Sequence, residues 1–109
     1  MSDAVDVKDK KAEDKKLELE KLVDKDGKPV MNIKLYSPFK TYFDELGYSI
    51  SGVNDTGPFD ILPRHHNFIT LLTAGELVVR PLNRAEQKFK ISGGLMHVKA
   101  DQVKVFLDI

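Results

Sequence analysis

Turn-forming residues recur every eight to twelve positions after residue 30, and this spacing limits the fold more than any other feature of the chain. In the segments between them, apolar residues either alternate with more polar ones or form short apolar runs. In the first segment Met31, Ile33 and Leu35 alternate in this way before Ser37-Pro38, where proline lacks the amide that a sheet ladder needs. Period-two patterning indicates strands with one buried face.

The same pattern continues to the end of the chain. The strongest turn cluster is Asn54-Asp55-Thr56-Gly57-Pro58, and a hairpin is expected to turn at Ala100-Asp101. About eight or nine segments, with no helix after residue 30, predict an all-β fold. The expected architecture is a small two-sheet β-sandwich of roughly eight to ten short strands, with a flattened barrel as the alternative. The later strand segments are Phe39–Phe43, Tyr48–Gly52, Phe59–Leu62, Phe68–Leu72, Leu77–Val79, Phe89–Ile91, Leu95–Val98 and Val103–Leu107.

Residues 1–29 differ in composition and are expected to form a charged N-terminal extension, which precedes a β-domain over residues 30–109. Their first 28 positions hold eight lysines and nine acids with few apolar side chains. Such a segment buries too little apolar surface to offset its ordering entropy, so we expect disorder or a partly formed helix over about 9–26, ended by Gly27. A solubilising tail and a docking helix are the two interpretations.

Charge and composition exclude several classes of protein. The 17 Lys+Arg balance the 17 Asp+Glu. A dedicated nucleic-acid binder is usually basic, with its positive charge on one face, so no nucleic-acid partner is expected. No apolar run approaches the ~18 residues of a membrane span, so no direct membrane insertion is expected. The N-terminus lacks the apolar stretch of a secretory signal, and none is expected. The absence of cysteine excludes disulfides, thiolate zinc sites and a cysteine nucleophile.

No catalytic or cofactor-binding constellation is present in the sequence. Ser92-Gly93-Gly94 lacks the lysine of a phosphate-binding loop. Asp44 and Glu45 point to opposite faces of a strand and cannot act together on one bond. Asp24-Lys25-Asp26-Gly27 lacks the remaining ligands of a calcium loop. We therefore expect no enzyme, no cofactor and no metal.

His65 and His66 are the strongest remaining candidates for a chemical site. Adjacent side chains of an extended chain point apart, so this pair cannot chelate one ion without further ligands. The favoured interpretation is a histidine that closes a turn by hydrogen bonding, while one of the pair faces a partner.

The β-domain is small for a chain with a single core. A core of this size leaves only ~3–5 kcal/mol of net stability without further support. Since neither a disulfide nor a metal is expected, packing one sheet face on a partner would supply that support. Size therefore favours a subunit of a larger assembly.

Three blocks of the sequence match motifs of one protein family in the same order. They are Ile33–Phe43, Thr56–Gly75 and Phe89–Asp108. The middle block contains Gly57-Pro58-Phe59-Asp60-Ile61-Leu62-Pro63-Arg64-His65, which is similar to Gly-Glu-Leu-Gly-Ile-x-Pro-Gly-His. The last block contains Ser92-Gly93-Gly94 and a Val-x-Val-x-x-Asp ending. Over about residues 32–108 the chain resembles the N-terminal β-sandwich of the epsilon subunit of F-type ATP synthases, which is called delta in mitochondria.

This resemblance implies a mechanical role without chemistry. In that family the sandwich clamps the foot of the rotating gamma subunit and rests on the polar loops of the membrane c-ring. The implied partners are therefore gamma and the c-ring, and the implied location is cytoplasmic and peripheral to the bacterial inner (plasma) membrane. Phe59 is expected as the apolar tip of a stiff loop. The residues expected to bind partners are Ser37, Gly57, Pro58, Phe59, Asp60, Pro63, Arg64 and His65.

The chain also departs from the family pattern. Pro58-Phe59-Asp60 stands where Glu-Leu-Gly is common, so the acid is shifted by two positions. Arg64 replaces a usual glycine, so either a positive φ there costs of order 1 kcal/mol or the local turn differs. The family continues past the position of Ile109 into a helical hairpin, so the inhibition and ATP binding linked to that hairpin are not expected here. The alternatives are a free-standing β-sandwich adaptor or ligand-binding module and, third, an enzyme that uses His65 or His66.

Overall fold

The computed structural model describes residues 22–108, which form eight β-strands and, within that range, no helix. The predicted all-β fold is confirmed, with the number of strands at the lower end of the expected range. The strands are β1 (Met31–Tyr36), β2 (Thr41–Asn54), β3 (Gly57–Ile61), β4 (Phe68–Leu72), β5 (Gly75–Pro81), β6 (Gln87–Ile91), β7 (Gly94–Lys99) and β8 (Gln102–Leu107).

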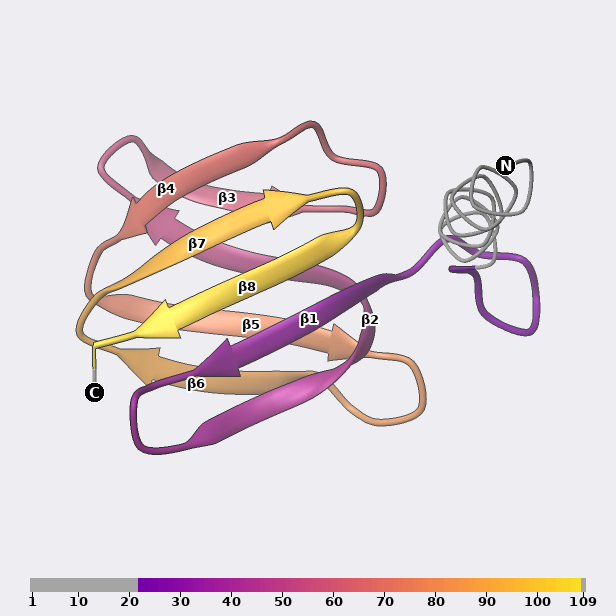
Figure 1. Ribbon diagram of the computed structural model, residues 1–109, viewed down its shortest axis with the longest axis horizontal. Helices are drawn as coiled ribbons and strands as arrows, with labels where there is room; N and C mark the ends of the chain where they lie inside the picture. Colours follow the sequence, from indigo (N-terminus) through magenta and orange to yellow (C-terminus); the bar gives the residue numbers. More distant parts are fainter. Residues whose placement is uncertain (1–21, 109) are drawn as a thin grey trace, which may run out of the picture.

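Two layers share one long strand (Figure 1). The first layer has the order β4-β7-β8-β1 and ends on the first half of β2, while β3, the second half of β2, β5 and β6 form the second layer. The β1–β8 pair is parallel, and every other pair of strands is antiparallel. One continuous sheet thus bends over itself to make the sandwich.

Strand β2 passes from one layer to the other at Gly47, which pairs with β1 along one edge and with β5 along the other. A Cβ at this position would lie 2.7 Å from Ile33 Cδ1 and 3.1 Å from the carbonyl oxygen of Arg80, so glycine lets the two strands approach closely here. A register shift next to Gly47 adds a bulge, which increases the local bend. The segments Phe39–Phe43 and Tyr48–Gly52, expected as separate strands, are parts of this one strand.

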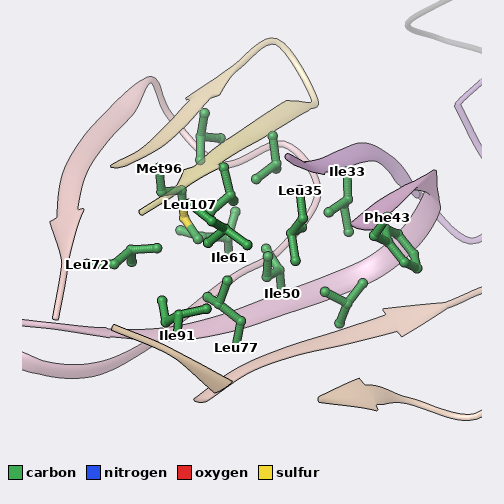
Figure 2. Packing of buried hydrophobic residues seen from close by; sticks show 14 of the residues in the cluster. Ile33, Leu35, Phe43, Ile50, Ile61, Leu72, Leu77, Ile91, Met96 and Leu107 are labelled. Carbon is green, nitrogen blue, oxygen red and sulfur yellow. The ribbon is translucent and has the colours of Figure 1, made fainter. Parts of the chain in front are cut away.

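The core lies between the layers and is built from alternate side chains of the strands (Figure 2). Strand β1 shows the predicted alternation of buried and half-buried residues. Ile50 pairs with Ile61 on one side and with Val79 on the other, so three strands meet at the centre of the second layer. The buried cluster comprises Met31, Ile33, Leu35, Phe43, Ile50, Ile61, Leu72, Leu77, Val79, Ile91, Met96, Val98, Val103, Val105 and Leu107.

The predicted hairpin turn at Ala100-Asp101 is confirmed. Lys99 pairs with Gln102, so two residues connect β7 to β8. Ala100 has a φ of 51° and Asp101 a φ of 60°. Positive φ at both central positions is the geometry of a type I′ turn, whose twist matches that of the flanking strands.

Residues 22–30 form a short strap ahead of β1. Val23 makes an isolated antiparallel bridge with Pro29, and a turn connects them. Gly27 has the positive φ expected of a helix C-cap, 84°, but it lies in this turn. The helix expected over about 9–26 is therefore wrong for residues 22–26, and its earlier residues lie outside the described part of the chain.

Asp24 fastens the strap to the sandwich. One of its carboxylate oxygens accepts the backbone N–H groups of Asp26 and Lys28, each at 2.8 Å, and the other accepts the hydroxyl of Tyr48 at 2.5 Å. The hydrogen bond from Tyr48 lowers the pKa of Asp24 from its usual 3.8, and the same bond raises the pKa of Tyr48 above its usual 10.0. Asp24 thus orders the backbone of this turn and connects it to β2.

The Asp24–Tyr48 hydrogen bond should stabilise the folded chain over a range of pH that ends where Asp24 becomes protonated and where Tyr48 becomes deprotonated. A carboxyl group with a lowered folded pKa contributes stability above its usual pKa and loses it as the pH falls through the folded pKa. A phenol with a raised folded pKa loses its contribution as the pH rises through that pKa. We expect the difference in urea midpoint between wild type and Tyr48→Phe to be constant from about pH 5 to 9 and to shrink below about pH 4. A difference unchanged at pH 3 would assign the effect to packing of the ring.

Candidate partner interface

Four large side chains form an apolar strip across the outer face of the β4-β7-β8-β1 layer. Leu71 pairs with Leu95, Leu95 with Phe106, and Phe106 with Tyr36, so one register row contains all four. Leu71 is 71% exposed, Leu95 39% and Phe106 40%. The rings of Tyr36 and Phe106 meet edge to face, with centroids 5.4 Å apart. A contiguous apolar row that faces water marks an interaction surface, whereas scattered apolar residues do not.

The β1–β2 turn carries a further exposed apolar side chain that is not part of the strip. This is Phe39, which is 91% exposed. Ser37 closes this turn. Its N–H donates to the carbonyl oxygen of Lys40 at 2.8 Å, and its Oγ accepts the N–H of Phe39 at 3.3 Å. Ser37, one of the predicted partner-binding residues, is itself buried. The turn therefore exposes Phe39 to solvent, and the Ser37 hydroxyl accepts a hydrogen bond within the turn.

The structure separates the predicted partner-binding residues into two groups. The β1–β2 turn, which contains Ser37, and the β2–β3 turn, which leads into Gly57 and Pro58, lie at the left-hand end of the sandwich in Figure 1. The β3–β4 loop, with Pro63, Arg64 and His65, lies at the opposite end beside the β7–β8 turn. These residues are therefore not gathered into one site.

Phe59 lies within β3 and is not a loop tip. Its ring is half-buried against the core and meets the ring of Phe68 edge to face at 5.7 Å. Alternation along β3 turns Pro58 and Asp60 to solvent, where Asp60 accepts a hydrogen bond from the hydroxyl of Ser51. The expectation of an apolar tip at Phe59 is therefore wrong, because the paired strand continues through this position.

Of the two alternatives at Arg64, the structure has the positive φ, with a value of 66°. Its N–H donates to Asp101 Oδ1 at 2.6 Å, which ties the β3–β4 loop to the β7–β8 turn. An arginine held in the left-handed region costs of order 1 kcal/mol, so a contact between two loops maintains local strain here.

Arg64→Gly should raise the free energy of unfolding by about 0.5–1 kcal/mol, because glycine adopts this φ without steric conflict. Arg64→Ala is the matched control, since it removes the charge but keeps a Cβ in the left-handed region. Urea denaturation of the two variants measures the difference. An equal gain from both would attribute the effect to charge and contradict the role of φ.

His65 and His66 lie side by side and do not point apart. Their ring centroids are 4.2 Å apart with an interplanar angle of 26°, and both rings meet Phe68 edge to face. The expected opposition holds for an extended chain, whereas a loop connects β3 and β4 at this point. His65 Nδ1 lies 2.8 Å from the carbonyl oxygen of His66, which agrees with a turn-closing role. In the described range 22–108, no group of three or more His, Cys, Asp or Glu side chains could hold a metal ion.

Sequence patterning does not single out the apolar strip. Strand β4 carries apolar residues at inward and outward positions alike, with Leu72 buried while Ile69 and Leu71 are exposed. A continuous apolar run of this kind is usual for a strand covered on both faces. That signal indicates a second covering surface, but the sequence alone does not show which strands combine to form it.

One family model matches most of the chain. It is described as "ATP synthase, Delta/Epsilon chain, beta-sandwich domain", and it covers residues 30–109. The chain belongs to this family. The ATP synthase epsilon chain of Moorella thermoacetica is 30% identical over 78 residues, which are 72% of this chain and 58% of that one. The epsilon chain of Geotalea uraniireducens is 28% identical over 78 residues, with 72% and 56% covered.

Solved structures share the delta/epsilon sandwich fold. A chain in the Euglena gracilis mitochondrial ATP synthase (OSCP/F1/c-ring) matches with a TM-score of 0.67 at 21% identity over 72% of this chain and 50% of that one. A chain in the Tetrahymena thermophila mitochondrial ATP synthase central stalk and c-ring matches with a TM-score of 0.60 at 21% identity, covering 71% and 62%. At this identity the likeness concerns the fold. The chain spans little more than half the length of its Moorella and Geotalea relatives, and among residues 22–108 no helix is long and apolar enough to cross a membrane.

Proposed function

We propose that this delta/epsilon-type chain is a non-catalytic rotor-stalk subunit of a proton- or sodium-driven ATP synthase, which joins the gamma subunit to the membrane c-ring by binding both. Family membership and relatives named as epsilon chains support this role. The two solved structures with the same fold belong to assemblies that contain a c-ring, and one of them is described as a central stalk. In this proposal the chain is peripheral to the cytoplasmic face of the bacterial plasma membrane.

The observation that carries the proposal is the apolar strip. Leu71, Leu95, Phe106 and Tyr36 come from four adjacent strands of one rigid layer, so their spacing is set by the sheet ladder. A subunit that transmits torque needs a contact surface on paired strands, because a force applied to loops would move the loops and not the whole subunit. We assign the strip to the gamma subunit, since a buried apolar centre with aromatic and leucine side chains is typical of lasting interfaces.

The end of the sandwich that carries the β1–β2 and β2–β3 turns supplies the second contact in this proposal, toward the c-ring. It offers the exposed ring of Phe39 and the exposed Pro58 at the start of β3. Gly57 has a φ of 117°, which keeps the β2–β3 turn tight. Pro63, Arg64 and His65, at the other end, remain predicted contacts of the rotor.

The test is co-purification with the gamma subunit encoded in the same genome. We expect Phe106→Ser to weaken association at least about tenfold, because truncating a central aromatic anchor is among the costliest interface changes. Val78→Ser is the matched control, since Val78 is half-buried on the outer face of the opposite layer. Circular dichroism of each variant checks that it folds. A wild-type chain that never associates with gamma would reject the proposal in favour of the free-standing adaptor.

A further inference from the structure

A row of basic side chains runs beside the apolar strip on the same outer face. Lys104 on β8 pairs with His97 on β7 and with Lys34 on β1, which places the three side chains in adjacent register positions one row from the strip. Lys34 also extends toward the strip, and its ammonium lies 5.1 Å from the ring centroid of Tyr36. We call His97, Lys104 and Lys34 the basic row, in which Lys34 and Lys104 supply the positive charge.

Within the described residues, no side chain of the basic row takes part in an ion pair. Three ion pairs occur among residues 22–108, and all of them lie on other residues. The acid that faces the row is Asp44, which pairs in register with Lys34 at its far end. Like charges at directly opposite sheet positions repel, so Lys34 beside Lys104 is a cost to the isolated sheet.

On the outer face of the other layer, basic side chains form ion pairs with an acid of the same chain. There Glu76 lies opposite Lys90 across the β5–β6 pair, as Asp44 lies opposite Lys34 across the β1–β2 pair. Glu86 forms ion pairs with Arg80 at 3.6 Å and with Lys88 at 4.0 Å. The two faces thus differ at Lys104, whose register partners on β1 and β7 are Lys34 and His97 and include no acid.

We infer that the partner surface covering the apolar strip carries a row of carboxylates that faces His97, Lys104 and Lys34. This inference rests on the proposed function. It adds that the gamma subunit bound by this chain has acidic side chains on the contact surface. Complementary rows of charge along an apolar contact set the register of two surfaces and reject partners without the acidic row. The repulsion between Lys34 and Lys104 is relieved when the acids arrive, so stability of the isolated chain and affinity for the partner change in opposite directions.

The experiment measures binding of the purified gamma subunit to the full chain at 50 mM and 500 mM NaCl. We expect Lys104→Gln to weaken binding about two- to fivefold at low salt and Lys104→Glu to weaken it at least about tenfold. The urea midpoint of isolated Lys104→Gln should equal or exceed that of wild type, because one repelling charge is gone. Lys88→Gln and Lys88→Glu are the matched controls on the opposite face and should bind gamma as wild type does.

The results separate this inference from the proposed function. Salt-independent binding, or wild-type affinity of Lys104→Glu for gamma, overturns the acidic row while Phe106→Ser still tests the strip. Absence of gamma binding by wild type overturns both. Salt-dependent binding of wild type to vesicles of phosphatidylglycerol and phosphatidylcholine, lost in Lys104→Glu without a matching loss for gamma, would assign the row to lipid and overturn it as a protein contact.

Discussion

Gly94→Ala is expected to lower the free energy of unfolding by about 2–3 kcal/mol. A Cβ at this position would lie 2.6 Å from the carbonyl oxygen of Phe106, and no side-chain rotation can relieve a clash with the backbone. Gly94 pairs with Leu107 at the first position of the β7–β8 ladder. The strands must therefore separate at this point, and urea denaturation should show a lower midpoint. Since a core of this size supplies only ~3–5 kcal/mol, the variant should retain little net stability.

Gly93→Ala is the matched control, because it adds the same methyl group one residue earlier. The nearest atom to its Cβ would be the carbonyl oxygen of Leu72 at 3.5 Å, an ordinary van der Waals distance. Replacing glycine where the backbone allows it is neutral or slightly stabilising, since the unfolded chain loses freedom. Equal losses from both variants would contradict the clash at Gly94 and indicate that this turn needs the flexibility of both glycines.

The strands that sequence analysis predicts best are those with one covered face. In β1, Met31, Ile33 and Leu35 are buried and their neighbours are half-buried, as the alternation indicates. The β7–β8 hairpin also follows from local pattern, since a two-residue turn separates two alternating runs. These predictions succeed because the period of the side chains and the position of the turn are both local properties.

The crossing of β2 between layers could not be predicted from local pattern. Phe39, Thr41 and Phe43 alternate as a strand face should, yet Phe39 is exposed in a turn and Thr41 is exposed at the start of β2. The bend depends on the approach of Gly47 to the backbone of Arg80, which only the folded chain brings together. A long-range contact thus turns two apparent strands into one.

The candidate interface was predictable only in part. The resemblance left two alternatives at Arg64, a positive φ or a different local turn, and the structure has the positive φ. The resemblance did not lead to the apolar strip, whose residues belong to four strands and meet only through their pairing register. Surfaces that combine several strands require the sheet order, and the β1–β8 parallel pair in particular joins segments distant in sequence.

Leu35→Ala and Leu71→Ala delete the same atoms in opposite surroundings, so together they separate stability from assembly. Leu35 is 0% exposed, and its register partners Phe43 and Val105 are also buried. Its truncation leaves a cavity between the layers and should cost about 3–4 kcal/mol, which would leave little of the ~3–5 kcal/mol of net stability. Leu71 is 71% exposed, so its truncation should change the free energy of unfolding by less than about 0.5 kcal/mol.

Binding should show the reverse order once the fold is intact. Urea denaturation gives the stability of each variant, and co-purification with gamma at a temperature where Leu35→Ala remains folded gives the assembly. We expect Leu71→Ala to lose association while unfolding like wild type, because the apolar row contributes its free energy only when a partner covers it. If Leu71→Ala were as unstable as Leu35→Ala, the strip would be part of the core and not an interface. If it were stable and bound gamma like wild type, the partner would cover another face of the sandwich.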